Sequence, residues 1–143
     1  MSLYVVDASV ALKWLLPAHS EPLVGPAARL LLRYTRREVD ILVPDLFWAE
    51  VGNALWNAVR RSRSTRAAAA AAIRTLREYN LPTASSFSLV EPAFEIAVVF
   101  DRTVYDCIYV ALARESGGEL LTADERLANS LAAYQPVKWL GAL

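Results

Sequence analysis

Near its start the chain reads LYVVDAS over residues 3–9, four apolar residues followed at once by an aspartate, an alanine and a serine. A short run that is apolar throughout is typical of a strand covered on both faces, as in a parallel sheet. In such sheets ligands bind beyond the carboxyl ends of the strands. This stretch therefore predicts a buried strand that brings Asp7 and Ser9 to the edge where a site would form.

The rest of the chain alternates strand-like and helix-like segments. Short apolar runs predict further strands over residues 41–43, 86–90, 119–122 and 137–140. Helical spacing and end signals predict helices over residues 8–16, 22–37, 45–62, 66–79, 92–100, 103–115 and 124–133. Asp45 and Thr65 are expected to cap the helices that they precede. This alternation predicts an α/β fold with a central, mostly parallel sheet of about 4–5 strands and helices on both faces.

Length and composition set the class of protein. The 143 residues predict a single domain spanning residues 1–143, because a chain of this size can bury roughly 70% of its unfolded surface. Apolar residues make up 55% of the sequence, but charges interrupt every run before the roughly 18 residues of a membrane span. The N-terminus has no leader pattern, so we expect a cytoplasmic protein without membrane contact. Cys107 is the only cysteine and is expected to be a small buried residue.

The net charge of zero hides an uneven distribution of charge along the chain. Residues 29–77 hold ten arginines and four acids, a balance of +6, whereas residues 78–143 hold nine acids and four basic residues, a balance of −5. Such a division is consistent with a surface that faces a polyanion beside a carboxylate-rich centre, although solvated helix faces give similar counts.

Three aspartates stand where strands end or helices begin. Asp7 follows the first strand, Asp124 lies two residues beyond the strand at 119–122, and Asp106 lies in the first turn of the helix that Thr103 opens. Each of them has an ordinary structural explanation. Asp7 or Ser9 could cap a helix, Thr103 with Asp106 reads as a capping box, and Thr122 with Glu125 reads as another that would place Asp124 in the first turn.

Glu50 is harder to explain as a helix cap. It lies about five positions into the helix that starts near residue 45, among apolar neighbours, and forms a polar stripe with Asn53 and Asn57. The stripe could be a solvated outer face. If it faces the carboxyl edge of the sheet instead, Glu50 meets the three aspartates.

Four carboxylates at one edge would need compensation. Two of them about 4 Å apart repel by roughly 4 kcal/mol at an effective dielectric of 20. Hard oxygen ligands without cysteine or histidine pairs suit Mg²⁺ or Mn²⁺. Such an ion activates water and stabilises the charge that develops in a phosphoryl displacement.

Four segments resemble those of a known family in their residues, their order and their spacing. They read VVDAS at 5–9, PDLFWAEVGNAL at 44–55, TVYDCIYVALA at 103–113 and LLTADERL at 120–127. They resemble the signature segments of PIN-domain ribonucleases, and most closely those of the toxins of VapBC toxin–antitoxin pairs. The resemblance covers almost the whole chain and implies a PIN-like three-layer α/β/α sandwich.

The resemblance also implies an activity and a set of site residues. It implies a metal-dependent endoribonuclease that cuts single-stranded regions of RNA, often tRNA or rRNA, and leaves a 5′-phosphate and a 3′-hydroxyl. Asp7, Glu50, Asp106 and Asp124 would be the catalytic acids that hold one or two Mg²⁺ or Mn²⁺ ions. Ser9 and Thr122 would support them. A homodimer is implied as well, together with an antitoxin that fills a groove near the helix carrying Glu50 and the basic turn at 60–63.

Other enzyme classes fit the sequence poorly. The five glycines cannot form a phosphate-binding loop of the nucleotide-binding type. A Ser-His-Asp hydrolase would have to use His19, the only histidine, without a Gly-x-Ser-x-Gly turn. Two alternatives to a ribonuclease stay open, a non-catalytic RNA- or protein-binding module of the same fold and a DNA-directed nuclease.

The sequence does not identify the residues that bind substrate. Which arginines contact RNA is left open. Trp14, Trp48 and Trp56 could stack on bases, but packing in the core or at an interface is the more common role of such residues.

Overall fold

The computed structural model describes residues 1–143, with the single exception of the Ser20 side chain. The described residues form one five-stranded parallel sheet in the order β3-β2-β1-β4-β5. Its strands are β1 (Ser2–Val6), β2 (Val39–Pro44), β3 (Thr83–Ala84), β4 (Glu119–Thr122) and β5 (Val137–Trp139). The central strand β1 pairs Ser2 with Val39 of β2 and Tyr4 with Glu119 of β4.

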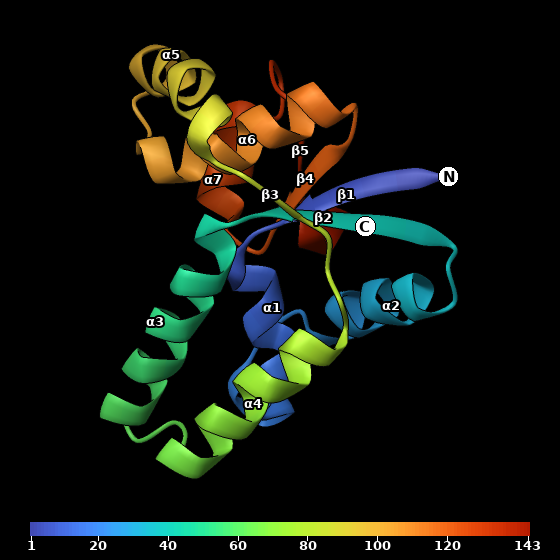
Figure 1. Cartoon of the computed structure of the whole chain (residues 1–143), viewed down its shortest axis with the longest axis vertical. Helices are drawn as coiled ribbons and strands as arrows, with labels where there is room; N and C mark the ends of the chain where they lie inside the picture. Colours follow the sequence, from blue (N-terminus) through green and yellow to red (C-terminus); the bar gives the residue numbers. More distant parts are fainter.

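Helices cover both faces of this sheet. In Figure 1 helices α5, α6 and α7 lie above the sheet, and α1, α2 and α4 lie below it. The helices are α1 (Ala8–Leu15), α2 (Val24–Thr35), α3 (Leu46–Arg60), α4 (Arg66–Glu78), α5 (Val90–Phe100), α6 (Val104–Ser116) and α7 (Glu125–Leu131). The predicted α/β fold with a parallel sheet between two helical layers is confirmed.

The carboxyl ends of the strands share one edge, which lies on the left in Figure 1 where α1 and α3 begin. The chain leaves β1 toward β2 on one side, and β4 pairs with β1 on the other. Such a reversal of strand order opens a crevice beyond the strand ends, where ligands of α/β proteins bind. The loops that follow β1 and β4 border this crevice.

The core explains why the first strand is apolar throughout. Val5 and Val6 of β1 and Leu120 and Leu121 of β4 are fully buried, because helices cover both faces of these strands. Helix α6 is buried over Cys107–Ala113 and contacts β1, β2 and β4. Burial raises the pKa of the Cys107 thiol to about 11, so this side chain stays protonated and packs as a small apolar group, as expected.

The predicted strand at 86–90 is wrong. The third strand is the two-residue β3, which pairs Thr83 with Val43 of β2. Phe87–Leu89 forms a 3₁₀ turn, closed by the Leu89 N–H donating to the Ser86 carbonyl, and α5 begins at Val90. The alternation of Phe87 and Leu89 imitated a strand, but Phe87 is 90% exposed. The spacing that decides the structure is helical, because Leu89 packs with the buried residues of α5.

The predicted cap of α3 is also wrong. Asp45 occupies the N-cap position, but its backbone is already helical and its side chain makes no capping hydrogen bond. Its carboxylate instead accepts a hydrogen bond from the Ser86 backbone N–H at 3.3 Å. The hydrogen bonds from Ser86 hold the pKa of Asp45 below its usual range. The side chain therefore fastens the start of α3 to the segment that leads into α5.

The predicted cap of α4 is confirmed, and a glycine ends α6. Thr65 caps α4 by accepting the Ala68 N–H at 3.1 Å. Gly117 ends α6 in the left-handed region, with φ of 73°, which an L side chain rarely adopts. A Cβ atom on Gly118 would lie 2.8 Å from the Leu3 carbonyl oxygen, so this position needs glycine for the close approach of β4 to β1.

Candidate active site

Asp7 lies directly after β1 and caps α1. Its Oδ1 accepts hydrogen bonds from the Val10 N–H, at 3.4 Å, and from the Ser9 hydroxyl. Burial raises the pKa of the Asp7 carboxyl from 3.8 to about 6, although hydrogen bonds from Ser9, Thr122 and Val10 act in the opposite direction. Asp7 therefore has both the capping role and a place at the crevice, and its ionised form is destabilised there.

Ser9 and Thr122 join the loops that follow β1 and β4. The Ala123 N–H donates to Ser9 Oγ at 3.0 Å, and Ser9 Oγ lies 3.5 Å from Thr122 Oγ1. Thr122 is fully buried and also accepts the Asp124 N–H at 3.0 Å. Because Ser9 also donates to Asp7, these two hydroxyls connect the first aspartate to the last.

Asp124 is itself the N-cap of α7. Its Oδ1 accepts the Leu127 N–H at 3.2 Å, so the predicted box of Thr122 with Glu125, which would place Asp124 inside the first turn, is wrong. The helix begins two residues later than that pattern requires, because Thr122 still belongs to β4 and accepts the Asp124 N–H instead. At α6 the expectation is correct, since Thr103 accepts the Asp106 N–H at 3.1 Å.

Glu50 is held by a residue that the sequence analysis did not single out. The Tyr109 hydroxyl donates to Glu50 Oε1 at 2.6 Å, and Tyr109 is only 3% exposed. Burial raises the pKa of Glu50 from its usual value, and the charge of Asp106 adds to the effect. Burial and the Glu50 carboxylate together raise the pKa of Tyr109, so this phenol keeps its proton. Tyr109 lies one turn after Asp106 on α6, a spacing that could have suggested a second polar group toward the site.

Asp106 interacts electrostatically with each of the other three acids. Its charge raises the pKa of both Asp7 and Glu50. The pKa of Asp106 itself is raised, first by burial and then by the charge of Asp124, while Arg102 acts in the opposite direction. The four predicted acids, which come from four separate segments of the chain, thus lie within electrostatic reach around one position.

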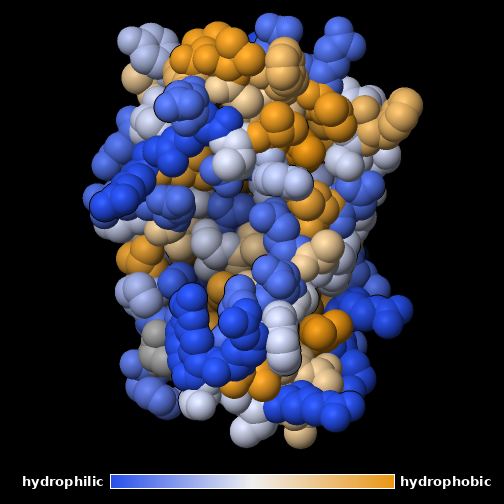
Figure 2. Space-filling view, turned by 90° about the vertical axis from the view of Figure 1, so that its left-hand side faces the viewer, coloured by the Kyte–Doolittle hydropathy of each residue, from blue (hydrophilic) through white to orange (hydrophobic). Residues whose placement is uncertain are grey.

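The acids are not neutralised by basic side chains. Within the described part of the chain none of the four forms an ion pair. Figure 2 faces this edge of the sheet and shows a hollow in the middle of the molecule, with hydrophilic side chains around it. Three unpaired carboxylates with raised pKa values, those of Asp7, Glu50 and Asp106, are an arrangement that a cation would stabilise.

The carboxylate oxygens are ligands that suit a hard divalent cation, although they are not arranged as a complete coordination shell. Among the described residues no group of three or more His, Cys, Asp or Glu side chains is arranged as a metal-ligand set. Hydrogen bonds hold Asp7, Glu50 and Asp124 in the positions just described, and the carboxylates repel one another. Mg²⁺ needs only one or two protein carboxylates, because it keeps several waters and takes substrate phosphates as further ligands. The carboxylates present therefore fit Mg²⁺ or Mn²⁺ in chemistry.

Three of the four tryptophans, Trp14, Trp48 and Trp56, are the candidates for base stacking. The Trp14 indole N–H donates to the Ala27 carbonyl at 2.8 Å, and that of Trp48 donates to Thr83 Oγ1 at 3.0 Å. Both side chains are partly buried against the core, which agrees with a packing role. Trp56 is 57% exposed and lies under the Arg60 guanidinium.

Comparison with known proteins identifies the class of protein. The family model of the PIN domain matches residues 4–130. The chain therefore belongs to the PIN domain family, as its four signature segments predicted. Ribonuclease VapC3 of Pyrobaculum aerophilum is 38% identical to it over 91 residues, which are 62% of this chain and 70% of that protein.

Solved structures agree with this assignment. PAE2754 from Pyrobaculum aerophilum matches 99% of this chain and 85% of its own, with a TM-score of 0.71 and 25% identity. VapC20 from Mycobacterium tuberculosis, a toxin that cleaves the sarcin-ricin loop, matches 90% of this chain and 95% of its own, with a TM-score of 0.62 and 20% identity. VapBC2 from Rickettsia felis, bound to a promoter DNA fragment, matches 96% of this chain and 98% of its own, with a TM-score of 0.68 and 11% identity. The last two likenesses concern the fold.

Proposed function

We propose that this protein is a metal-dependent endoribonuclease, the toxin of a toxin–antitoxin pair, which hydrolyses phosphodiester bonds in single-stranded regions of tRNA or rRNA in the cytoplasm. The observation that best supports this is the electrostatic coupling of Asp7, Glu50 and Asp124 to Asp106 at the carboxyl edge of the sheet. Membership of the PIN domain family and the likeness to a ribonuclease named VapC3 support the same activity. None of the helices described is long and apolar enough to cross a membrane.

Each side chain of the site has a role in this proposal. Asp7, Glu50, Asp106 and Asp124 hold one or two Mg²⁺ or Mn²⁺ ions and orient the water that attacks the phosphorus. The cation, when bound, supplies charge neutralisation and activation of that water. Ser9 and Thr122 fix the orientation of Asp7 through their hydroxyls, and Tyr109 fixes that of Glu50.

Cleavage of matched RNA and DNA tests the activity. A labelled single-stranded RNA and the DNA of the same sequence are incubated with Mg²⁺, Mn²⁺ or EDTA, and the ends of the fragments are identified. We expect RNA cleavage with either metal, no cleavage in EDTA, and 5′-phosphate with 3′-hydroxyl ends. No cleavage with either metal would support a binding module, and faster cleavage of the DNA would support a DNA-directed nuclease. Cyclic 2′,3′-phosphate ends would show a different, metal-independent chemistry.

Removing the Tyr109 hydroxyl should weaken metal binding while the fold is kept. We expect Tyr109→Phe to lower Mn²⁺ affinity by about tenfold, because partners that orient metal ligands typically contribute 10- to 100-fold. Electron paramagnetic resonance of free Mn²⁺ measures the affinity, and thermal unfolding checks the fold. Cleavage should fall at low Mn²⁺ and recover as Mn²⁺ is raised. Tyr34→Phe is the matched control, since its hydroxyl donates to the Tyr79 carbonyl at 3.0 Å. An unchanged Mn²⁺ affinity in Tyr109→Phe would contradict this positioning role.

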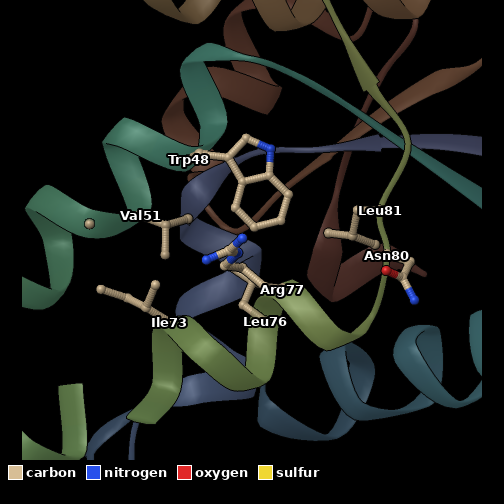
Figure 3. A pocket seen from close by; sticks show the side chains of 8 residues that line it. Trp48, Val51, Ile73, Leu76, Arg77, Asn80 and Leu81 are labelled. Atoms are coloured by element: carbon tan, nitrogen blue, oxygen red, sulfur yellow. The ribbon is translucent and has the colours of Figure 1, made fainter. Parts of the chain in front are cut away.

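The cavity between α3 and α4 is where we propose that an antitoxin segment docks. It has a volume of about 410 Å³ and is lined by Trp48, Val51, Gly52, Ile73, Leu76, Arg77, Asn80 and Leu81. Figure 3 shows the Arg77 guanidinium in this mainly apolar space, close to the labelled Val51 and Trp48. An apolar segment with one acidic side chain complements such a lining. We expect Arg77→Glu to weaken capture of the antitoxin encoded beside this chain's own reading frame.

The apolar surface of α5 supports the proposed homodimer. Val90, Phe94, Val98 and Val99 are 48% to 72% exposed, and the apolar area at the top of Figure 2 lies over this helix. Exposed patches of this kind mark interaction sites. We expect Val98→Asp to convert a dimer to a monomer in sedimentation equilibrium, because a charge would be buried without a partner. Leu32→Asp, at an exposed position of α2, should leave the dimer intact. A monomeric parent protein would contradict the proposal.

A further inference from the structure

An open groove leads away from the candidate active site along α3. Its volume is about 500 Å³, and it is lined by Ala8, Ser9, Leu12, Leu46, Ala49, Glu50, Asn53, Ala54, Asn57 and Tyr105. One end contains Ser9 and Glu50, which belong to the site already described. The groove is therefore continuous with the place where the scissile phosphate would lie.

The wall formed by α3 carries a regular series of polar side chains. Glu50, Asn53, Asn57 and Arg60 follow one another at intervals of three and four residues, which keeps them on one face of the helix. At a rise of 1.5 Å per residue the series extends for about 15 Å. The first member is a carboxylate of the site, the middle two are amides, and the last is a cation.

The two amides can donate and accept hydrogen bonds. Asn53 is exposed and makes no hydrogen bond to any described residue. Asn57 Oδ1 accepts from the Arg60 guanidinium at 3.3 Å, and its NH₂ group makes no hydrogen bond to a described residue. Asparagine amides recognise base edges and ribose hydroxyls because they offer a donor and an acceptor side by side.

Helix α6 adds an aromatic ring to the lining of the groove. Tyr105 lines the groove, is 63% exposed and precedes Asp106 in the first turn of α6. The rest of the lining is mainly alanine and leucine, so the floor is apolar. An exposed ring beside an apolar floor is suited to base stacking, whereas polar groups at the rim bind the sugar and base edges.

Beyond the residues that line the groove, the polar series of α3 ends in a cation. Arg60 hydrogen-bonds to Asn57 and stacks at 5.8 Å over the Trp56 ring, so its guanidinium is oriented from two sides. It begins the basic turn that continues with Arg61 and Arg63. A polyanion leaving the site along α3 would meet this cation at the point where the amides end.

We propose that this groove is the subsite for the nucleotides next to the cleaved bond of a single-stranded RNA. Tyr105 stacks on a base, Asn53 and Asn57 hydrogen-bond to base edges or ribose hydroxyls, and Arg60 binds a phosphate. Asn53 and Asn57 are thus residues that determine sequence preference. The inference rests on the proposed ribonuclease activity, and it specifies how that site holds its substrate.

Binding without cleavage tests the groove separately from catalysis. The probe is a fluorescein-labelled RNA pool of about 12 random nucleotides, a length within the range that single-strand grooves cover. Fluorescence anisotropy in EDTA measures its affinity for each variant. We expect a loss of about tenfold or more for Tyr105→Ala, and recovery of most of that affinity in Tyr105→Phe. The Asn53→Ala, Asn57→Ala double variant should lose about tenfold, and Asn129→Ala, at an exposed asparagine of α7, should lose nothing.

Two further readouts separate the roles within the groove. Sequencing of fragment ends, at enzyme concentrations that offset the weaker binding, should show a weaker base preference beside the cut in the double asparagine variant. Arg60→Gln should weaken binding equally for all sequences and lower the slope of log affinity against log salt by about 1, whereas Arg36→Gln at the end of α2 should not. Unchanged affinity and an unchanged cleavage pattern in the asparagine variant would overturn the subsite, even if the parent enzyme cleaves RNA. A parent protein that cleaves no RNA would instead overturn the proposed function.

Discussion

Replacing Asp7 or Asp106 with asparagine should reduce metal-dependent RNA cleavage by at least about a hundredfold, which corresponds to roughly 2.7 kcal/mol of transition-state stabilisation. Asparagine keeps the size of the side chain and one oxygen, but it cannot supply the negative charge that holds a divalent cation. Single-turnover cleavage of a labelled RNA at saturating Mn²⁺ measures the loss. Asp40→Asn, at an exposed position of β2, is the matched control and should cleave like the parent protein.

The losses of cleavage rate caused by Asp7→Asn and Asp106→Asn should not be additive. The charge of Asp106 raises the pKa of Asp7, and both residues belong to the one cation site that we propose. Residues that act as a unit give grossly non-additive losses. We therefore expect the double variant to be little slower than the worse single variant. Cleavage by Asp7→Asn at the rate of the parent protein would mean that the activity comes from another site or a contaminating nuclease.

The same Asp7→Asn variant should be more stable than the parent protein when no metal is bound. Burial raises the pKa of Asp7 from 3.8 to about 6, so the folded state binds this proton more tightly than the unfolded state does. The contribution of such a carboxyl to the free energy of unfolding is fully present below about pH 4 and is lost as pH rises to about 6. The loss is about 3 kcal/mol, at 1.36 kcal/mol per pKa unit. Asparagine does not ionise and can still cap α1, so the variant avoids this loss.

Urea unfolding in EDTA at several pH values measures this effect. The Asp7→Asn variant should exceed the parent protein by up to about 3 kcal/mol above pH 6, and the two should converge near pH 4. Addition of Mn²⁺ should reverse the order at neutral pH, because only the parent protein gains free energy from tight binding. A difference that stays constant between pH 4 and pH 7.5 would show that the substitution acts by some route other than the charge of Asp7.

Much of the fold and of the candidate site can be predicted from the sequence, because the strands that define the sheet also place the residues after them at the site. An apolar strand followed at once by Asp7 predicts both a buried parallel sheet and a carboxylate at its edge, and Asp124, two residues after β4, follows the same logic. Glu50 and Asp106 lie on helices, so their place depended on the resemblance of the segments around them. Whether they hold a metal remains a prediction.

The residues that sequence reasoning missed depend on packing between distant segments. Tyr109 stands among buried residues of α6, so by pattern it is an ordinary core residue. Its role follows only from the packing that brings its hydroxyl to Glu50, 59 positions away. Asp45 was misread for the same reason, since its partner Ser86 lies 41 positions away. The strand at 86–90 was misread because a two-residue pairing at β3 leaves almost no pattern of its own.

The double role of Asp7 and Asp124 as helix caps has a consequence for loss-of-function variants. A side chain that closes a helix through its oxygen can be exchanged for asparagine and the helix end survives. One amino-acid change at either position would therefore remove the proposed cleavage and still leave a well-folded chain, so loss of activity need not carry a loss of the fold.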